Sequence, residues 1–287
     1  MKTDYRCFYC FARAYENLLA KEPISNETKR AFTCEMAQLF LNSQDGFKAP
    51  VYSRELRQIF KHYTGNYDPY IDEKCISNDL ALSLYPKYKE LVSQSADSFD
   101  TALRLALAGN IIDFGIHHQY DLNGTITKVL QSKLAIDHSA ELQRQLRTAK
   151  MVLYLGDNSG EIVFDRLFIE TIAHPNVYFA VRGFPVINDV TIDDAIYTKM
   201  DSVAKIISNG YDAPSTILEK SSVEFNEIFL NADLVISKGQ GNFEGLHDNT
   251  SKNIFFLLMT KCDVISEVLN TRKGDFVVKC NKMIFNN

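Results

Sequence analysis

The feature that most constrains the fold is a change in hydrophobic period near the middle of the chain. Over roughly residues 1–147, apolar side chains recur at steps of three and four, as Phe8, Phe11, Tyr15 and Leu18 do. This spacing is typical of amphipathic helices. No convincing β-type alternation occurs in that half. Beyond it, short apolar runs that suit buried strands alternate with helical segments. Alternation of strand and helix predicts βαβ units and a parallel sheet with helices on both faces.

We therefore predict an α/β fold, with a Rossmann-like α/β/α domain over residues 148–287 preceded by an all-helical domain over residues 1–147. In open α/β sheets, ligands bind beyond the carboxyl ends of the strands. The loops directly after the strands are therefore where a site is expected. The expected strands are 151–155, 177–181, 203–208, 233–237, 255–259 and 275–279.

Net charge and the distribution of apolar residues exclude several classes of protein. The 287 residues carry a formal net charge of -5, whereas a nucleic-acid binder needs a basic face. Arg6, Arg13 and Glu16 interrupt the N-terminal stretch, which is not typical of a signal peptide, and no apolar run is long enough to span a bilayer. We expect a cytoplasmic protein with mostly reduced cysteines that binds neither nucleic acid nor membranes.

A carboxylate and a carboxamide stand side by side in the loop after the first predicted strand, residues 156–161 (GDNSGE). Asp157 and Asn158 offer hard oxygen ligands, which suit Mg²⁺, Mn²⁺ or a similar ion. Ser159 and Gly160 then open a helix, whose unpaired N–H groups and positive dipole end would face the same crevice. The plainer interpretation is that Asp157 or Ser159 caps that helix.

A second acidic strand end follows at Asp189, after the second predicted strand. Capping of the next helix would also explain this residue. If the two strands are neighbours, however, Asp157, Asn158 and Asp189 converge on one point, and burying two carboxylates there requires a cation. Together the two loops favour a metal site.

The third polar loop, residues 238–245 (KGQGNFEG), follows the fourth predicted strand. Lys238 is a compact cation suited to a phosphate, and glycines let the backbone approach a ligand closely. A solvated lysine is the plainer interpretation. Gly239, Gly241 and Gly245 also form G-x-G-x-x-x-G, which is one residue away from the dinucleotide pattern and similar to S-adenosylmethionine sites. Its place on a late βα turn disfavours a dinucleotide.

The remaining motifs are absent or ambiguous. The chain has no Walker loop and no G-x-S-x-G elbow, which argues against a P-loop NTPase and a serine hydrolase. Cys7 and Cys10 form a single C-x-x-C inside a segment with a helical pattern. Packing, metal binding and redox chemistry stay open for this pair, since a closed zinc site needs four ligands.

Five segments together resemble the damage-control phosphatase family, long catalogued as a domain of unknown function. They are 156–165 (GDNSGEIVFD), 182–195 (RGFPVINDVTIDDA), 237–245 (SKGQGNFEG), 65–74 (GNYDPYIDEK) and 108–116 (AGNIIDFGI). The early C-x-x-C resembles the mainly prokaryotic branch. The resemblance implies a helical region packed on a Rossmann-like domain. It also implies divalent-metal-dependent hydrolysis of phosphate esters, including sugar phosphates and damaged phosphometabolites.

The resemblance further implies roles for particular residues. The family's metal ligands match the three oxygen-bearing side chains singled out above. Its phosphate-binding lysine and asparagine match Lys238 and Asn242. By position, Asn110 and Asp113 resemble a contribution of the helical region to the pocket.

These observations lead to one expected reaction. Asp157, Asn158 and Asp189 hold one divalent ion (Mn, Co, Ni or Mg), which polarises a phosphoryl oxygen of a small phosphorylated metabolite. Two alternatives stay open. One is an S-adenosylmethionine-dependent carboxyl methyltransferase, an activity described for a human relative, and the other is a non-enzymatic metabolite-binding module. The groups expected to position the substrate are Lys238, Asn242 and the N–H groups at Ser159 and Gly160, with Glu161 as a candidate base.

Overall fold

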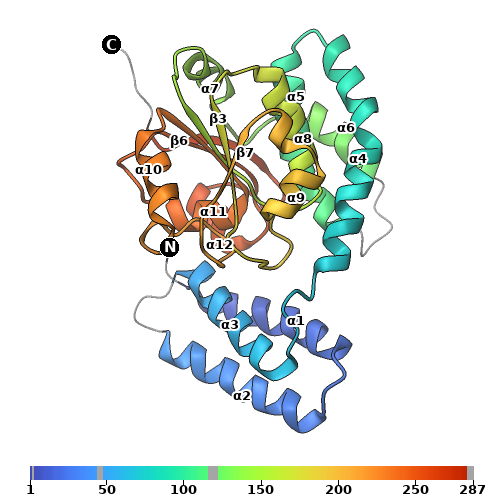
Figure 1. Ribbon diagram of the computed structural model, residues 1–287, viewed down its shortest axis with the longest axis vertical. Helices are drawn as coiled ribbons and strands as arrows, with labels where there is room; N and C mark the ends of the chain where they lie inside the picture. The colour runs from blue at the N-terminus through green and yellow to red at the C-terminus, as the bar shows by residue number, and fades with distance from the viewer. Residues whose placement is uncertain (2, 44–47, 116–121, 283–287) are drawn as a thin grey trace.

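A seven-stranded sheet organises the second half of the chain in the computed structural model, which describes residues 1, 3–43, 48–115 and 122–282 (Figure 1). The order across the sheet is β1-β7-β6-β5-β2-β3-β4, and every neighbouring pair is parallel except β6 with β7. The strands are β1 (Ile136–Asp137), β2 (Val152–Leu155), β3 (Val177–Val181), β4 (Lys205–Ser208), β5 (Leu234–Lys238), β6 (Ile254–Met259) and β7 (Phe276–Cys280).

The direction of travel across the sheet reverses at β2. From β2 the chain adds β3 and β4 on one side, and it then returns to add β5 and β6 on the other. Such a switch point opens a crevice at the carboxyl ends of the two strands that flank it, here β2 and β5. The loops predicted to carry chemistry therefore meet at one edge of the sheet.

Helices cover both faces of this sheet. The described α-helices are α1 (Tyr5–Lys21), α2 (Asn26–Asn42), α3 (Ala49–Thr64), α4 (Ile71–Gln94), α5 (Ser98–Gly115), α6 (Leu122–Gln131), α7 (Ser139–Leu146), α8 (Glu161–Ile172), α9 (Ile192–Tyr197), α10 (Val223–Asn231), α11 (Gly239–Leu246) and α12 (Asp263–Leu269). Two 3₁₀ turns, Met200–Ser202 and Leu218–Lys220, complete the described elements. In the part of the chain that is described, no helix is both long and apolar enough to cross a membrane.

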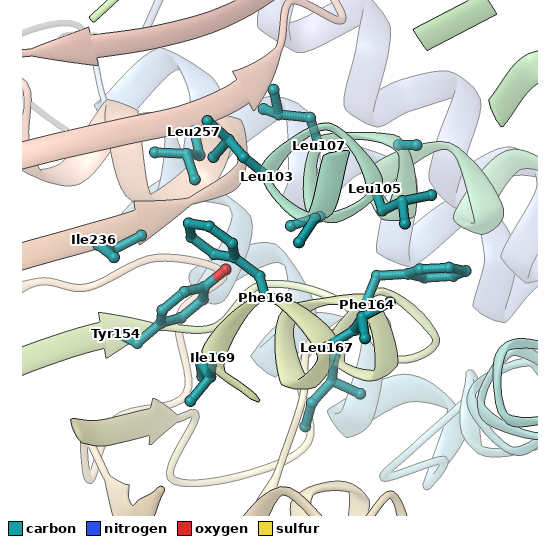
Figure 2. Close-up of a cluster of buried hydrophobic side chains, with 14 of the residues drawn as sticks. Leu103, Leu105, Leu107, Tyr154, Phe164, Leu167, Phe168, Ile169, Ile236 and Leu257 are labelled. Atoms are coloured by element: carbon teal, nitrogen blue, oxygen red, sulfur yellow. The ribbon is translucent and has the colours of Figure 1, made fainter. Parts of the chain in front are cut away.

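The strands divide their side chains between two apolar clusters because successive residues of a strand point to opposite faces. Tyr154 and Ile236 belong to the cluster that contains α5 and α8, whereas Val235 belongs to the one that contains α10, α11 and α12. Figure 2 shows the first cluster, in which Phe168 of α8 lies between Tyr154 of the sheet and Leu103 of α5. This packing fixes α8, and with it the loop between β2 and α8.

The first three helices have a core of their own. Tyr15, Phe32, Tyr52 and Phe60 are buried together in a cluster drawn only from α1–α3 and the residues beside them. Figure 1 shows these helices below the sheet, facing its α11 and α12 end. In contrast, α4, α5, α6 and α7 bury their apolar residues in the same cluster as the sheet.

The α/β fold is confirmed, and each of the six predicted strands is present within two residues of its expected limits. Three features differ from the prediction. Strand β1 was missed because two residues show no readable alternation. The antiparallel direction of β7 was not predicted, because an apolar run does not encode the direction in which a strand pairs. The packing also does not divide at residue 147, since α4–α7 belong to the core of the sheet and only α1–α3 form a separate cluster.

Candidate active site

The loops that follow β2 and β3 are joined by backbone hydrogen bonds. The parallel pairing of the two strands ends at Leu155 and Ala180. The chain after β3 then turns back, so that Asn158 and Asp189 form an antiparallel bridge. The N–H of Val190 donates to the carbonyl oxygen of Asp157 at 2.9 Å. The structure therefore brings Asp157, Asn158 and Asp189 together, as the two loops together suggested.

Arg182 connects the two carboxylates. Its Nε donates to Oδ2 of Asp189 at 2.6 Å, and its Nη2 lies 3.8 Å from Oδ1 of Asp157. Arg182 directly follows β3 and is only 2% exposed. A guanidinium between two buried carboxylates orients both of them and offsets part of their charge. No role for Arg182 was predicted from the sequence, although its position at a strand end beside two acidic loops was a usable signal.

The carboxamide of Asn158 is held by its nitrogen. Its Nδ2 donates to Oδ2 of Asp157 at 2.8 Å and to Oε2 of Glu161 at 3.3 Å. Its Oδ1 accepts no hydrogen bond from the described residues. With the nitrogen end used by the protein, the oxygen is the end that remains for a ligand.

Burial and neighbouring charge raise the pKa of Asp157 well above its ordinary value. Desolvation is the largest cause, followed by the charges of Glu161 and Asp189, while Lys261 and Arg182 act in the opposite direction. When burial and like charges raise the pKa of a carboxyl group, an added cation stabilises its ionised form. At Asp157, the effect of the neighbouring carboxylates thus exceeds the effect of the neighbouring cations.

Gly239, the first residue of α11, lies against Asp157. Its φ is +76°, and a Cβ added to it would lie 1.9 Å from Oδ2 of Asp157. Only glycine fits here, for both backbone and steric reasons. The start of α11 is therefore packed directly onto one of the candidate ligands.

The donor set fits a hard divalent cation. Two carboxylates and an amide oxygen are the ligands that Mg²⁺ and Mn²⁺ prefer. Within the described ranges, no group of three or more His, Cys, Asp or Glu side chains is arranged to hold a metal ion. A cation at this place would accordingly depend on the oxygen of Asn158 as its third protein ligand.

A cavity of about 620 Å³ opens beside these three side chains. The ends of the sheet, α11, the start of α12 and the turn before β7 form one side, while α1 and the start of α3 form the other (Figure 1). Its lining includes Asp157, Asn158, Asp189, Gln240, Gly241, Glu244, Lys261, Cys262, Asp263, Lys273, Arg6, Cys7, Cys10, Phe11 and Arg13. A volume of this size accommodates a small metabolite.

Lys238 takes a different place from the one predicted. Its side chain is fully buried, and its ammonium donates to the carbonyl of Ala106 at 2.9 Å, to Glu161 at 2.7 Å and to Asp165. These three acceptors use its three protons, so no donor is left for a phosphate. Lys238 instead neutralises two carboxylates beneath the site, because a buried ammonium is stable only when it is paired.

Three other groups that were predicted to contact the phosphate also have hydrogen-bond partners within the protein. The N–H of Ser159 donates to the carbonyl of Asn188 at 2.9 Å, and the N–H of Gly160 donates to Oδ1 of Asn78 at 2.7 Å. Asn242 is fully buried and donates to the carbonyls of Gly156 and Lys238 at 3.0 and 2.8 Å. These groups fasten loops to each other, because buried polar groups require partners.

The other predicted residues divide into two groups. Glu161 is fully buried, and its carboxylate accepts hydrogen bonds from Lys238 and Asn158, an arrangement that suits positioning rather than proton transfer. Asn110 and Asp113 lie on α5, but their side chains fall outside the described part of the structure. No role for them follows from the geometry.

Lys261 is a site residue that the sequence analysis missed. It follows β6 as Lys238 ends β5, it lines the cavity, and its charge lowers the pKa of Asp157. A lysine at a neighbouring strand end was the available signal. The cavity therefore has a cation beside its acidic end, although not the predicted one.

The two cysteines of the C-x-x-C also line the cavity rather than the core of α1–α3. Cys7 is half-buried and Cys10 is exposed, and Cys262, which also lines the cavity, lies near both. Burial raises the pKa of Cys7 to about 11 and also raises the pKa of Cys10. Both therefore remain protonated thiols near neutral pH.

Comparison with known proteins agrees with this architecture. The model of the damage-control phosphatase ARMT1-like domain matches residues 3–277, and the chain belongs to that family. It is 33% identical over 288 residues to the damage-control phosphatase PH1575 of Pyrococcus horikoshii, covering 98% of this chain and 99% of that protein. A damage-control phosphatase of Archaeoglobus fulgidus is 33% identical over 75% of this chain and 76% of its own length. The crystal structure of the Pyrococcus protein matches with a TM-score of 0.88 over 98% of this chain and 100% of that one.

Proposed function

We propose that this protein is a divalent-metal-dependent phosphatase that hydrolyses small phosphorylated metabolites, such as sugar phosphates or damaged phosphometabolites. Relatives over most of its length are named damage-control phosphatases. The observation that carries the proposal is the meeting of Asp157, Asn158 and Asp189 at the wall of a cavity of metabolite size.

The metal-binding end depends on groups that hold the ligands in place. A divalent ion bound by Asp157, Asn158 and Asp189 would polarise a phosphoryl oxygen and offset charge that develops during hydrolysis. Arg182 fixes the carboxylate of Asp189, and Glu161 fixes the amide nitrogen of Asn158. Such supporting contacts orient ligands before the ion arrives.

The phosphate would be positioned by groups other than those predicted. Lys261 offers a cation at the acidic end of the cavity. Gln240 and Gly241, in the first turn of α11, also line the cavity. The N–H groups of a helix's first turn lack intrahelical acceptors and favour an anion. These groups replace Lys238, Asn242 and the amides at the start of α8.

The glycine pattern that suggested S-adenosylmethionine has an explanation within the protein. A Cβ on Gly239 would meet Asp157, one on Gly241 would lie 2.2 Å from the carbonyl oxygen of Pro214, and one on Gly245 would lie 2.2 Å from Oγ of Ser215. Each glycine is required by a protein neighbour, so the motif does not call for a methyl donor.

Phosphate release from a panel of sugar phosphates and a generic aryl phosphate tests the proposal. We expect activity that a chelator removes and that Mn²⁺, Co²⁺, Ni²⁺ or Mg²⁺ restores. Asp157→Asn and Asp189→Asn should each lower turnover about 10²-fold or more. The control is Asp193→Asn, which changes an exposed carboxylate nearby.

Two results would contradict the proposal. One is wild-type turnover by the Asp157→Asn variant, and the other is activity that does not respond to chelation. Binding of S-adenosylmethionine with methyl transfer would favour the methyltransferase. Ligand-induced stabilisation without turnover under any metal would favour a binding module.

A further inference from the structure

The cavity extends well beyond the space that one phosphate needs. Its acidic end is formed by Asp157, Asn158 and Asp189, but much of its lining comes from α1, and the turn between α12 and β7 adds Lys273. The lining residues of α1 and Lys273 are therefore available to contact the rest of the substrate.

Two cations of this distant region have no partner of their own. Arg13 of α1 and Lys273 of the turn before β7 line the cavity, and neither side chain forms a hydrogen bond or ion pair with any residue in the described ranges. Arg6, which also lines the cavity, differs from them. Its guanidinium is bonded to Asp4 and Glu267.

The two cations act on the same place although they come from distant parts of the chain. Both lower the pKa of the Cys10 thiol, so both lie near it. Asp263 also lines the cavity, and no ion pair joins it to either cation. Glu244, the other carboxyl of this region, has its pKa raised to about 7 by burial and so carries less negative charge than an exposed carboxylate. This part of the cavity keeps positive charge that the protein does not neutralise.

We propose that the substrate carries a second anionic group, a carboxylate or a second phosphate, which Arg13 and Lys273 bind at the far end of the cavity. This inference rests on the proposed phosphatase function and narrows its substrate class. The phosphate to be hydrolysed lies at the acidic end beside Lys261, and the second anion lies toward α1. A phosphorylated sugar acid and a sugar bisphosphate have this pattern of charge.

Matched pairs of phosphate esters test the inference. Gluconate 6-phosphate is compared with glucose 6-phosphate, and fructose 1,6-bisphosphate with fructose 6-phosphate, at fixed ionic strength. For at least one pair, we expect kcat/KM to be about tenfold higher for the compound with two anions. Added salt should reduce this preference, because the cations are exposed.

Substitution of the two cations provides the second arm. Arg13→Gln and Lys273→Gln should each lower the preference about two- to fivefold, and the double variant about tenfold, mainly through KM. Arg30→Gln and Lys220→Gln, which remove exposed cations outside the cavity, should retain it. Equal kcat/KM within both pairs, or an equal preference in the double variant, would overturn the inference.

A binding measurement separates this inference from the proposed function. If no metal supports phosphate release, the function fails, and calorimetric binding of the same four compounds still decides the second-anion site. Tighter binding of the two-anion compounds that weakens in the double variant supports the site. Turnover of sugar phosphates without any preference leaves the function standing and refutes the site.

Discussion

The two walls of the cavity are held in different ways. At the ends of β2 and β3, polar side chains are buried and bonded to one another, and Asp157, Asn158 and Asp189 are each less than a tenth exposed. The α1–α3 wall has its own apolar core and reaches the rest of the chain through polar contacts such as Arg54 with Asp212.

The two walls therefore suit different tasks. Buried, mutually bonded groups hold a fixed geometry, which the chemistry of phosphate transfer needs. A wall joined through partly exposed ion pairs can vary in sequence and position at little cost in stability. We expect the first wall to govern reaction and the second to govern which metabolite enters.

The largest expected effect comes from removing the buried charge beneath the site. Lys238→Met leaves Glu161 and Asp165 buried without their cation, which should lower the free energy of unfolding by about 3–5 kcal/mol. Urea denaturation measures the loss. Lys205→Met, at an exposed lysine of β4, is the control. A loss below about 1 kcal/mol would show that the two carboxylates do not depend on Lys238.

The next effect concerns the contact between α11 and Asp157. Gly239→Ala places a methyl group on the carboxylate of Asp157 and should lower turnover about 10²-fold. Gly65→Ala is a matched control, since its φ of +69° carries a similar backbone cost but no atom lies within 4 Å of the added Cβ. Similar turnover in the two variants would mean that the space beside Asp157 is not restrictive.

A smaller effect should appear as a pH dependence of stability. Burial raises the pKa of Glu244 from 4.5 to about 7, so the folded protein binds more protons than the unfolded chain between those values. Wild-type stability should therefore fall relative to Glu244→Gln as the pH rises through this window, by at most about 3 kcal/mol. Denaturation at pH 5 and pH 8 measures it. A parallel pH response in the two proteins, matching the exposed-site control Glu227→Gln, would contradict the account.

The smallest effect is expected at the α1–α3 wall. Arg54→Gln removes its partly exposed ion pair with Asp212 and should lower the free energy of unfolding by no more than about 1 kcal/mol. Thermal denaturation beside Arg144→Gln, which breaks an exposed ion pair within α7, makes the comparison. A loss several times larger would show that this wall is held as firmly as the other.

The same contrast explains what the sequence could predict. Strand ends followed by Asp157 and Asp189 gave the candidate metal site, because parallel neighbours bring their carboxyl ends to one edge. The strands were predictable because they are short apolar runs. For the loops and helix starts, the sequence predicted where they lie but not which groups they bond.

What the sequence could not supply is which partner each polar group finds. Lys238 and Asn242 carry the right chemistry for a phosphate, yet distant acceptors such as Ala106 and Gly156 use their donors. Helical periodicity could not separate α1–α3 from α4–α7 either, because both sets are amphipathic and only the tertiary packing distinguishes them.

Location of a bound metal tests the central claim most directly. Crystals of the protein soaked in Mn²⁺ should show one anomalous-scattering peak within coordination distance of the oxygens of Asp157, Asn158 and Asp189, and Asp157→Ala should lose it. A peak elsewhere, or none at these residues at saturating Mn²⁺, would contradict the account.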